Sequence, residues 1–167
     1  MTQDLLVGVD TLRTQLRDKY REVALDPLGA SPLPHRPLAA RLGYEQATVD
    51  SLPDRAVESF AGVGNPFSLR RIEKGERVVD VGSGAGFDSF IAATQTGPTG
   101  TVVGIDMTAE MLTKSRATAE HLDFAHVEFL EGLAEGMPVE TGWADVVISN
   151  GRPVPIEAIR DVDLWTG

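Results

Sequence analysis

The stretch VVDVGSGAGFDSF, residues Val78–Phe90, decides the fold of this chain. It begins as an apolar run that contains one acid, Asp80, and continues through three alternate glycines, Gly82, Gly84 and Gly86. Glycine permits backbone conformations that other residues rarely adopt, so this composition predicts a tight turn between a strand and a helix. The start of such a helix also exposes unpaired backbone N–H groups. The stretch therefore predicts a place where a ligand lies against the main chain.

Strand patterns and helix patterns alternate through the rest of the C-terminal part. The strand patterns are RVVDV at 77–81, TVVGID at 101–106, HVEFL at 126–130 and ADVVIS at 144–149. Helix patterns follow the first two strands at 87–95 and 109–122, and Thr108 is expected to cap the second helix. This alternation predicts an α/β fold, a Rossmann-like parallel sheet with flanking helices.

The N-terminal part has helical patterns and no strand pattern. Apolar residues recur at spacings of three and four over 9–25, which is the period of an amphipathic helix. Four prolines within 26–37 predict an irregular connection. Ser51 is expected to cap a further helix that starts near Pro53 and runs through Phe60.

The length of 167 residues predicts one domain of ordinary size with an N-terminal extension. The predicted helical extension, or lid, covers residues 1–70 and precedes the sheet. The Rossmann-like ligand-binding domain covers 71–151, and a C-terminal tail covers 152–167.

Composition restricts the partners of the chain. Fifteen Lys and Arg residues against 25 Asp and Glu residues give a net charge of -10, which disfavours nucleic acid and anionic membrane surfaces. The absence of cysteine excludes disulfides, thiolate metal sites and thiol nucleophiles. The three histidines are scattered, and no metal site is expected. No signal peptide or membrane-spanning run is found, so the expected location is the cytoplasm.

The second strand pattern ends in Asp106, 20 residues after Gly86. An acid at this spacing is suited to hydrogen bonds with the two hydroxyls of a ribose. Strand, glycine loop, helix, strand and acid together predict a nucleoside site. The alternative is a purely structural turn followed by a surface aspartate.

The glycine loop departs from the dinucleotide pattern G-x-G-x-x-G, because its third glycine comes one position early and Phe87 fills the expected place. Asp80 and Asp88 flank the loop, and like charge opposes a pyrophosphate at this position. An adenosine with a sulfonium and an ammonium group has the opposite preference, and its charge would explain a buried Asp80. A nicotinamide-dependent oxidoreductase is an alternative that these charges disfavour.

VVDVGSGAGFDS and VVGIDMT resemble the class I S-adenosylmethionine-dependent methyltransferases, and EGLAEGMPV and DVVISNG extend the resemblance. AVESFAGVGNPFSL and VDLWTG resemble segments of the arsenite methyltransferase-like branch. The resemblance covers about residues 44–167. It implies S-adenosyl-L-methionine as the cofactor and a small molecule as the methyl acceptor.

The resemblance also implies that ten residues surround the cofactor: Asp80, Gly82, Ser83, Gly84, Gly86, Asp106, Met107, Leu133, Ala134 and Asn150. The loop 82–86 would pass under the methionine portion, and Asp80 would lie near its amine. Asp106 would hold the ribose. No catalytic residue is assigned.

The remaining implied roles concern the adenine and the acceptor. Met107 would pack on adenine, and Leu133 and Ala134 would border its edge. Asn150 would line the methyl-transfer side. Met107 and Leu133 are alternatively core residues, and Asn150 alternatively only ends its strand.

Two departures from the family pattern change the expected function. Thiolates bind arsenic in the arsenite-methylating relatives, whereas Val63 and Gly151 occupy the cysteine positions here, so arsenite is not expected as the substrate. A complete domain of this class has seven strands, and this sequence contains four strand patterns. The chain is therefore expected to be shortened after the fourth strand, and its incomplete sheet to have an open edge that a second copy or another chain covers.

Two functions remain open. The first is a working methyltransferase that acts on an unidentified small molecule. The second is a non-catalytic, truncated remnant that binds the cofactor or only a partner. The glycine loop and Asp106 favour retained cofactor binding, whereas the absent strand patterns favour lost catalysis.

Overall fold

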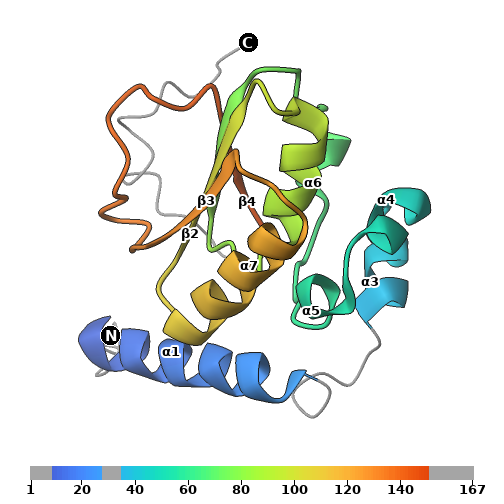
Figure 1. The fold of residues 1–167 in the computed structure, drawn as a ribbon. Coiled ribbons are helices and arrows are strands. Elements are labelled where there is room, and N and C mark those ends of the chain that lie inside the picture. Colours follow the sequence, from blue (N-terminus) through green and yellow to red (C-terminus); the bar gives the residue numbers. More distant parts are fainter. Residues whose placement is uncertain (1–8, 28–34, 151–167) are drawn as a thin grey trace, which may run out of the picture.

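The computed structural model describes residues 9–27 and 35–150, which form one parallel sheet with helices around it (Figure 1). The strands are β1 (Arg77–Val81), β2 (Thr101–Asp106), β3 (Val127–Glu131) and β4 (Val146–Ser149), in the order β3-β2-β1-β4. The predicted α/β fold with a parallel sheet, flanking helices and preceding N-terminal helices is confirmed.

Helices precede the sheet and alternate with its strands. Those before the sheet are α1 (Val9–Leu25), α3 (His35–Arg41), α4 (Gln46–Ser51), α5 (Asp54–Val57) and a 3-10 turn, η1 (Pro66–Ser68). Those between strands are α6 (Phe87–Thr96) and α7 (Ala109–His121). In the described residues no helix is long and apolar enough to cross a membrane.

The predicted helix over 9–25 is confirmed, but the prediction for Ser51 is wrong. Ser51 ends α4 instead of capping the next helix, and α5 ends at Val57. Pro53 disfavours a helical conformation at the residue before it, and Leu52 is extended, with φ -84° and ψ 140°. The chain therefore breaks into two short helices at this point.

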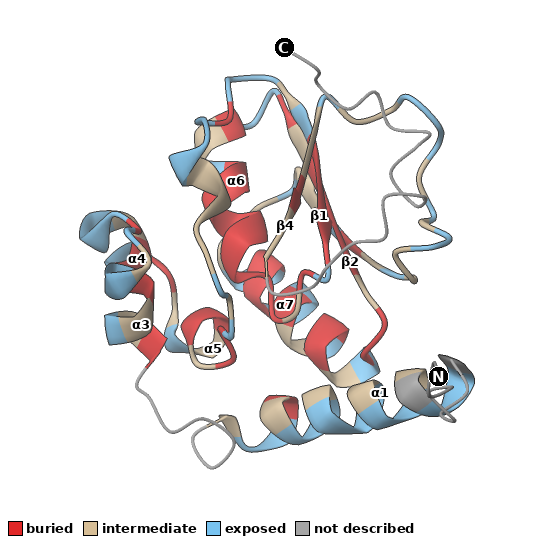
Figure 2. Cartoon of the chain, turned by 180° about the vertical axis from the view of Figure 1, so that it is seen from behind, coloured by how far each residue is buried: buried red, intermediate tan, exposed pale blue. Residues whose placement is uncertain are grey.

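The two faces of the sheet are covered differently. α6 and α7 pack on one face, where Phe90 and Phe129 belong to a buried cluster that includes residues of α4 and α5. On the other face Val79 and Ile105 pack against the long loop between β3 and β4, which includes Met137 and Trp143. The strands β1 and β2 are thus buried on both faces (Figure 2), as the apolar runs of a parallel sheet require.

The parallel register brings the carboxyl ends of three strands to one edge of the sheet. Val81 of β1 pairs with Ile105 of β2 and with Ser149 of β4. The glycine loop follows β1, Asp106 is the last residue of β2 and Asn150 follows β4, so all three meet at that edge. In an open parallel sheet, this is the edge where ligands bind.

Within residues 9–27 and 35–150, β4 pairs with β1 and has no strand on its other side. The expected incomplete sheet therefore has four strands in this part of the chain. The division at residues 70/71 and 151/152 stays a prediction. The predicted tail, 152–167, and Gly151 lie outside the described residues.

Candidate functional site

The glycine loop starts as a continuation of the pairing between β1 and β2. The amides of Gly82 and Ser83 donate to the carbonyl oxygen of Ile105 at 2.8 and 3.0 Å. Gly82 and Gly84 both have positive φ, 75° and 55°. A Cβ atom at Gly84 would meet nothing within 4 Å, so the backbone is uncovered there.

Gly86 is required for a different reason. It caps α6 at its N-terminus with φ 92°, a left-handed conformation. A Cβ atom at this position would lie 2.7 Å from the ring of Phe90 and 2.9 Å from that of Phe129. Glycine at position 86 therefore permits both the turn and the close packing of α6 on the sheet.

Asp106 ties the glycine loop to the start of α7. Its Oδ2 accepts from the Gly84 amide at 2.9 Å, and its Oδ1 accepts from the Thr108 amide at 2.8 Å. Thr108 is the N-cap residue, as predicted, but its side chain makes no capping bond. An ionised carboxylate has about four acceptor positions, so Asp106 keeps capacity for further donors.

Asp80 lies at the floor of the site and is 2% exposed. The hydroxyl of Ser89 donates to its Oδ2 at 2.6 Å. Burial, and then the charge of Asp88, raise the pKa of Asp80 to about 8, whereas the hydrogen bond from Ser89 opposes this rise. Among the residues that the structure describes, no basic side chain is paired with this buried carboxyl group.

Asp88 belongs to a buried hydrogen-bond network that joins α6 to the N-terminal part. Tyr44 donates from its hydroxyl to Oδ1 at 2.6 Å, and Asn150 donates from Nδ2 to Oδ2 at 2.9 Å. The Oδ1 atom of Asn150 accepts from the amides of Val63 and Gly64 at 2.9 and 3.0 Å. Burial raises the pKa of Asp88 to about 6, and the two hydrogen bonds lower it.

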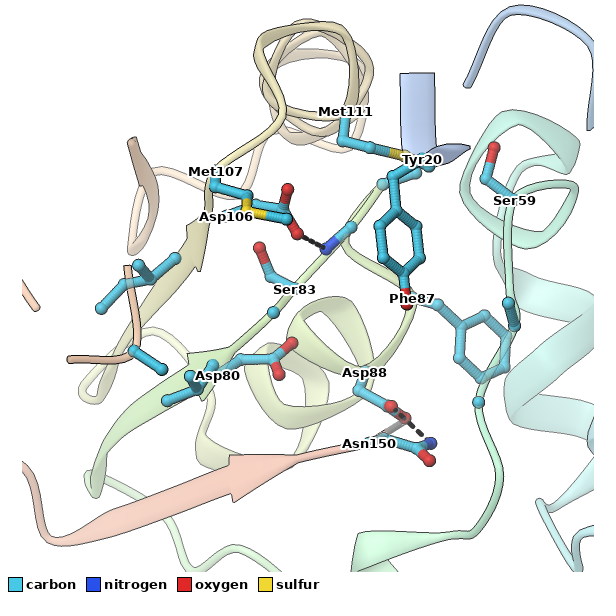
Figure 3. A pocket seen from close by; sticks show the side chains of 18 of the residues that line it. Tyr20, Ser59, Asp80, Ser83, Phe87, Asp88, Asp106, Met107, Met111 and Asn150 are labelled. Atoms are coloured by element: carbon cyan, nitrogen blue, oxygen red, sulfur yellow. Dashed lines mark hydrogen bonds between the residues drawn. The ribbon is translucent and has the colours of Figure 1, made fainter. Parts of the chain in front are cut away.

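Nine of the ten predicted residues line one cavity of about 420 Å³, within the usual size range of small-molecule sites. Gly86 is the exception, because it caps the N-terminus of α6 and is not among the lining residues. Figure 3 shows Asp106 and Met107 near the start of α7, with Asp80, Asp88 and Asn150 below them. The structure therefore gathers these residues at one place; their contacts with a ligand stay a prediction.

The sequence predicted a lid in the N-terminal helices but did not identify which of their residues line the cavity. These lining residues are Arg13, Leu16 and Tyr20 from α1 and residues 56 and 59–62 from α5 and the segment after it. The side chain of Tyr20 points from α1 into the cavity (Figure 3). Leu16 and Tyr20 are one helical turn apart on the predicted apolar face, but periodicity alone cannot say which surface that face covers.

The charges around the cavity are mainly negative. Asp80, Asp88, Asp106 and Glu135 line it, and among the described residues Arg13 is the one basic lining residue. Arg13 is paired with Glu135, at 3.5 Å. The backbone cradle and these acids fit a ligand that has a ribose and a positive charge. In the described residues, no group of three or more His, Cys, Asp or Glu could hold a metal ion.

Comparisons with known proteins agree with this geometry. Residues 72–164 match the family model described as a methyltransferase domain. The arsenite methyltransferase of Halobacterium salinarum is 46% identical over 110 residues, 66% of this chain and 28% of that protein. The arsenite methyltransferase of Aquipseudomonas alcaligenes is 40% identical over 83 residues, 46% of this chain and 24% of that protein.

Among solved structures, the arsenic(III) S-adenosylmethionine methyltransferase of Chlamydomonas reinhardtii is similar, with a TM-score of 0.57 and 30% identity. The match covers 72% of this chain and 40% of that one. The matched part thus spans about a quarter of the curated relatives' length and less than half of this solved chain. Because the family model matches more than half of the chain, the protein belongs to the class I S-adenosylmethionine-dependent methyltransferase domain family.

Proposed function

We propose that the cavity binds S-adenosylmethionine and that the chain transfers its methyl group to a small molecule other than arsenite. The observation that carries this proposal is the joint position of an uncovered glycine loop, Asp106 and Asp80 around one cavity. Asp106 already fixes the loop through Gly84, so its remaining acceptor positions are available to ribose hydroxyls.

Each predicted site residue has a role in the proposed complex. Residues 82–84 lie under the methionine portion, and Asp80 faces its ammonium group. Met107, Leu133 and Ala134 surround the adenine, which suits their apolar side chains and their place in the wall. Gly86 acts indirectly, by setting the turn from which α6 starts.

The bound donor supplies an electrophilic methyl group, and the protein contributes position and a dry environment. Phe60, Phe87 and Met111 line the cavity and are buried or nearly so, and they exclude water from it. Asn150 is a positioning residue in this proposal, because its amide is already bonded to Asp88, Val63 and Gly64. No catalytic residue is assigned.

The choice against arsenite rests on the chemistry of the ligands. Arsenic is soft and is held by thiolates, and this chain contains no cysteine. Val63, at one of the implied cysteine positions, is 78% exposed and does not line the cavity. The methyl acceptor proposed for this chain therefore differs from the arsenite in the names of these relatives.

A second candidate function is a non-catalytic module that binds the cofactor or a partner. The observation that favours it is the edge of β4, which has no partner strand in the described residues. Self-association along this edge stays a prediction. Light scattering coupled to size-exclusion chromatography tests it, and a monomer at micromolar concentrations would contradict it.

Two measurements test the proposed function. Titration calorimetry with S-adenosylhomocysteine should give micromolar binding, and the same titration with NADH should give none. A methyl-release assay with S-adenosylmethionine and a pool of small metabolites then distinguishes the enzyme from the non-catalytic module. The absence of S-adenosylhomocysteine binding would overturn the proposal.

A further inference from the structure

We infer that the buried pair Asp80–Asp88 holds a proton when the cavity has no ligand, and that binding of an ammonium-bearing donor releases it. The inference rests on the proposed function, because it concerns the same cavity. The affinity for the donor therefore depends on pH through the carboxyl groups of Asp80 and Asp88.

The carboxyl groups of Asp80 and Asp88 belong to one buried site. Asp80, at the end of β1, and Asp88, in the first turn of α6, line the same cavity and are 2% and 6% exposed. In Figure 3 both side chains lie below Asp106 and Tyr20. Two like charges removed from water in one site are unfavourable together, so their titrations are coupled.

In the described part of the chain, the groups that donate hydrogen bonds to the pair are neutral. Ser89 donates to Asp80, and Tyr44 and Asn150 donate to Asp88. These bonds stabilise a carboxylate but bring no positive charge to the site. The pKa of Tyr44 is itself raised by burial and by Asp88, so its hydroxyl stays protonated.

Within residues 9–27 and 35–150, the other charged side chains around the cavity do not compensate the pair. Asp106 adds negative charge and raises the pKa of Asp80 further. Arg13 lines the cavity but is paired with Glu135 and Asp10. Lys114 lies behind the wall at Ser59, where it is paired with Glu58 at 2.8 Å.

The pKa shifts of Asp80 and Asp88 agree with a shared proton. Burial raises the pKa of both Asp88 and Asp80, and the charge of Asp88 raises that of Asp80 further, so the pair shares one proton near neutral pH. An ammonium group near Asp80 favours the ionised form. The pair then changes from one negative charge to two, the ammonium group of the ligand places one positive charge beside Asp80, and the proton passes to the buffer.

The decisive experiment is a proton count on the whole chain. S-adenosylhomocysteine is titrated calorimetrically at pH 7 in phosphate and in Tris, whose ionisation enthalpies differ. We expect release of roughly 0.5 to 1 proton per ligand, and an affinity that rises up to about tenfold per pH unit between pH 6 and 8. 5′-Methylthioadenosine, which has the adenosine but no amino-acid group, should release none.

The outcomes separate this inference from the proposed function. If S-adenosylhomocysteine binds without proton release, or if 5′-methylthioadenosine releases as much, the inference is wrong and the proposed function stands. If S-adenosylhomocysteine does not bind at all, both are wrong.

A variant of Asp88 tests whether the released proton comes from the pair Asp80–Asp88. Asp88→Asn removes the like charge that raises the pKa of Asp80, so the release at pH 8 should fall by at least half and its midpoint should move to lower pH. Asp145→Asn is the matched control, because Asp145 pairs with Arg77 at the amino end of β1, and it should release as much as the wild type. Equal release from Asp88→Asn would contradict the inference, and circular dichroism verifies the fold of both variants.

Discussion

An aspartate lies at each end of β1, and the two aspartates differ in exposure and in their hydrogen-bond partners. At the amino end, Arg77 and Asp145 form an ion pair at 2.9 Å, and their side chains are 44% and 39% exposed. At the carboxyl end, Asp80 is 2% exposed and its hydrogen-bond partner is a neutral hydroxyl. A carboxylate that serves only the fold is paired near water, whereas a buried carboxyl group with a strongly raised pKa in a cavity marks a candidate ligand site.

The pKa values follow from this difference in environment. Hydrogen bonds from Arg77 lower the pKa of Asp145 to about 2, and burial raises the pKa of Asp80 to about 8. Arg77 also lies over the ring of Trp143, 5.8 Å from its centroid, which fixes the paired end of the strand. The two environments therefore shift the pKa of the same residue type in opposite directions.

The largest expected effect is at the ligand end, with Asp106→Ala. Loss of a charged acceptor for the ribose should weaken S-adenosylhomocysteine binding by about 100-fold, since hydrogen bonds to charged groups contribute about 1.5–3 kcal/mol each. Titration calorimetry measures the change, with Asp145→Ala as the control at the other end of the sheet. Unchanged affinity in Asp106→Ala would contradict the proposal that the carboxyl end of the sheet binds the ligand.

The next effect concerns the packing beside the buried acid. Gly104 pairs with Asp80 in the sheet, and a Cβ atom at Gly104 would lie 2.5 Å from the ring of Phe129. Gly104→Ala should lower the free energy of unfolding by about 1–3 kcal/mol through overpacking. Urea denaturation measures it. Gly136→Ala is the control, because a Cβ atom at Gly136 would meet nothing within 4 Å, and equal losses would contradict the packing argument.

Asp80→Asn should stabilise the ligand-free chain at high pH. The folded-state pKa of Asp80 is raised from 3.8 to about 8, so the folded state binds more protons and wild-type stability falls as pH rises across this window. The variant lacks that fall and should be more stable at pH 8 by on the order of 1 kcal/mol, with a smaller difference at pH 5. Denaturation at both pH values checks this, and a pH-independent difference would exclude a buried charge as the cause.

The smallest expected effect is at the exposed end, with Asp145→Asn. Its pKa is lowered in the folded state, so its contribution to stability is present above pH 4 and is lost as pH falls through about 2. Water screens the pair, and the change in unfolding free energy should be the smallest of the three stability changes predicted here. Urea denaturation at neutral pH tests the ranking, and a loss as large as that of Gly104→Ala would contradict it.

The local sequence pattern was sufficient to predict the two strands next to the glycine loop. The segments 77–81 and 101–106 were predicted with the observed bounds, because apolar runs between turn residues define buried strands locally. The prediction for Ser51 failed because two weak helix signals compete there, and Pro53 divides them. Propensity over a few residues does not decide between such alternatives.

The sequence by itself determined the parallel sheet, the glycine loop and the position of Asp106, since each follows from neighbours along the chain. Only the tertiary structure brought Tyr44 and Asn150 onto Asp88, and Leu16 and Tyr20 of α1 over the cavity. These contacts join residues that are far apart in the sequence, and periodicity predicts a buried face without naming its partner. Burial, and with it the charge state of Asp80, is likewise a property of everything packed around that residue.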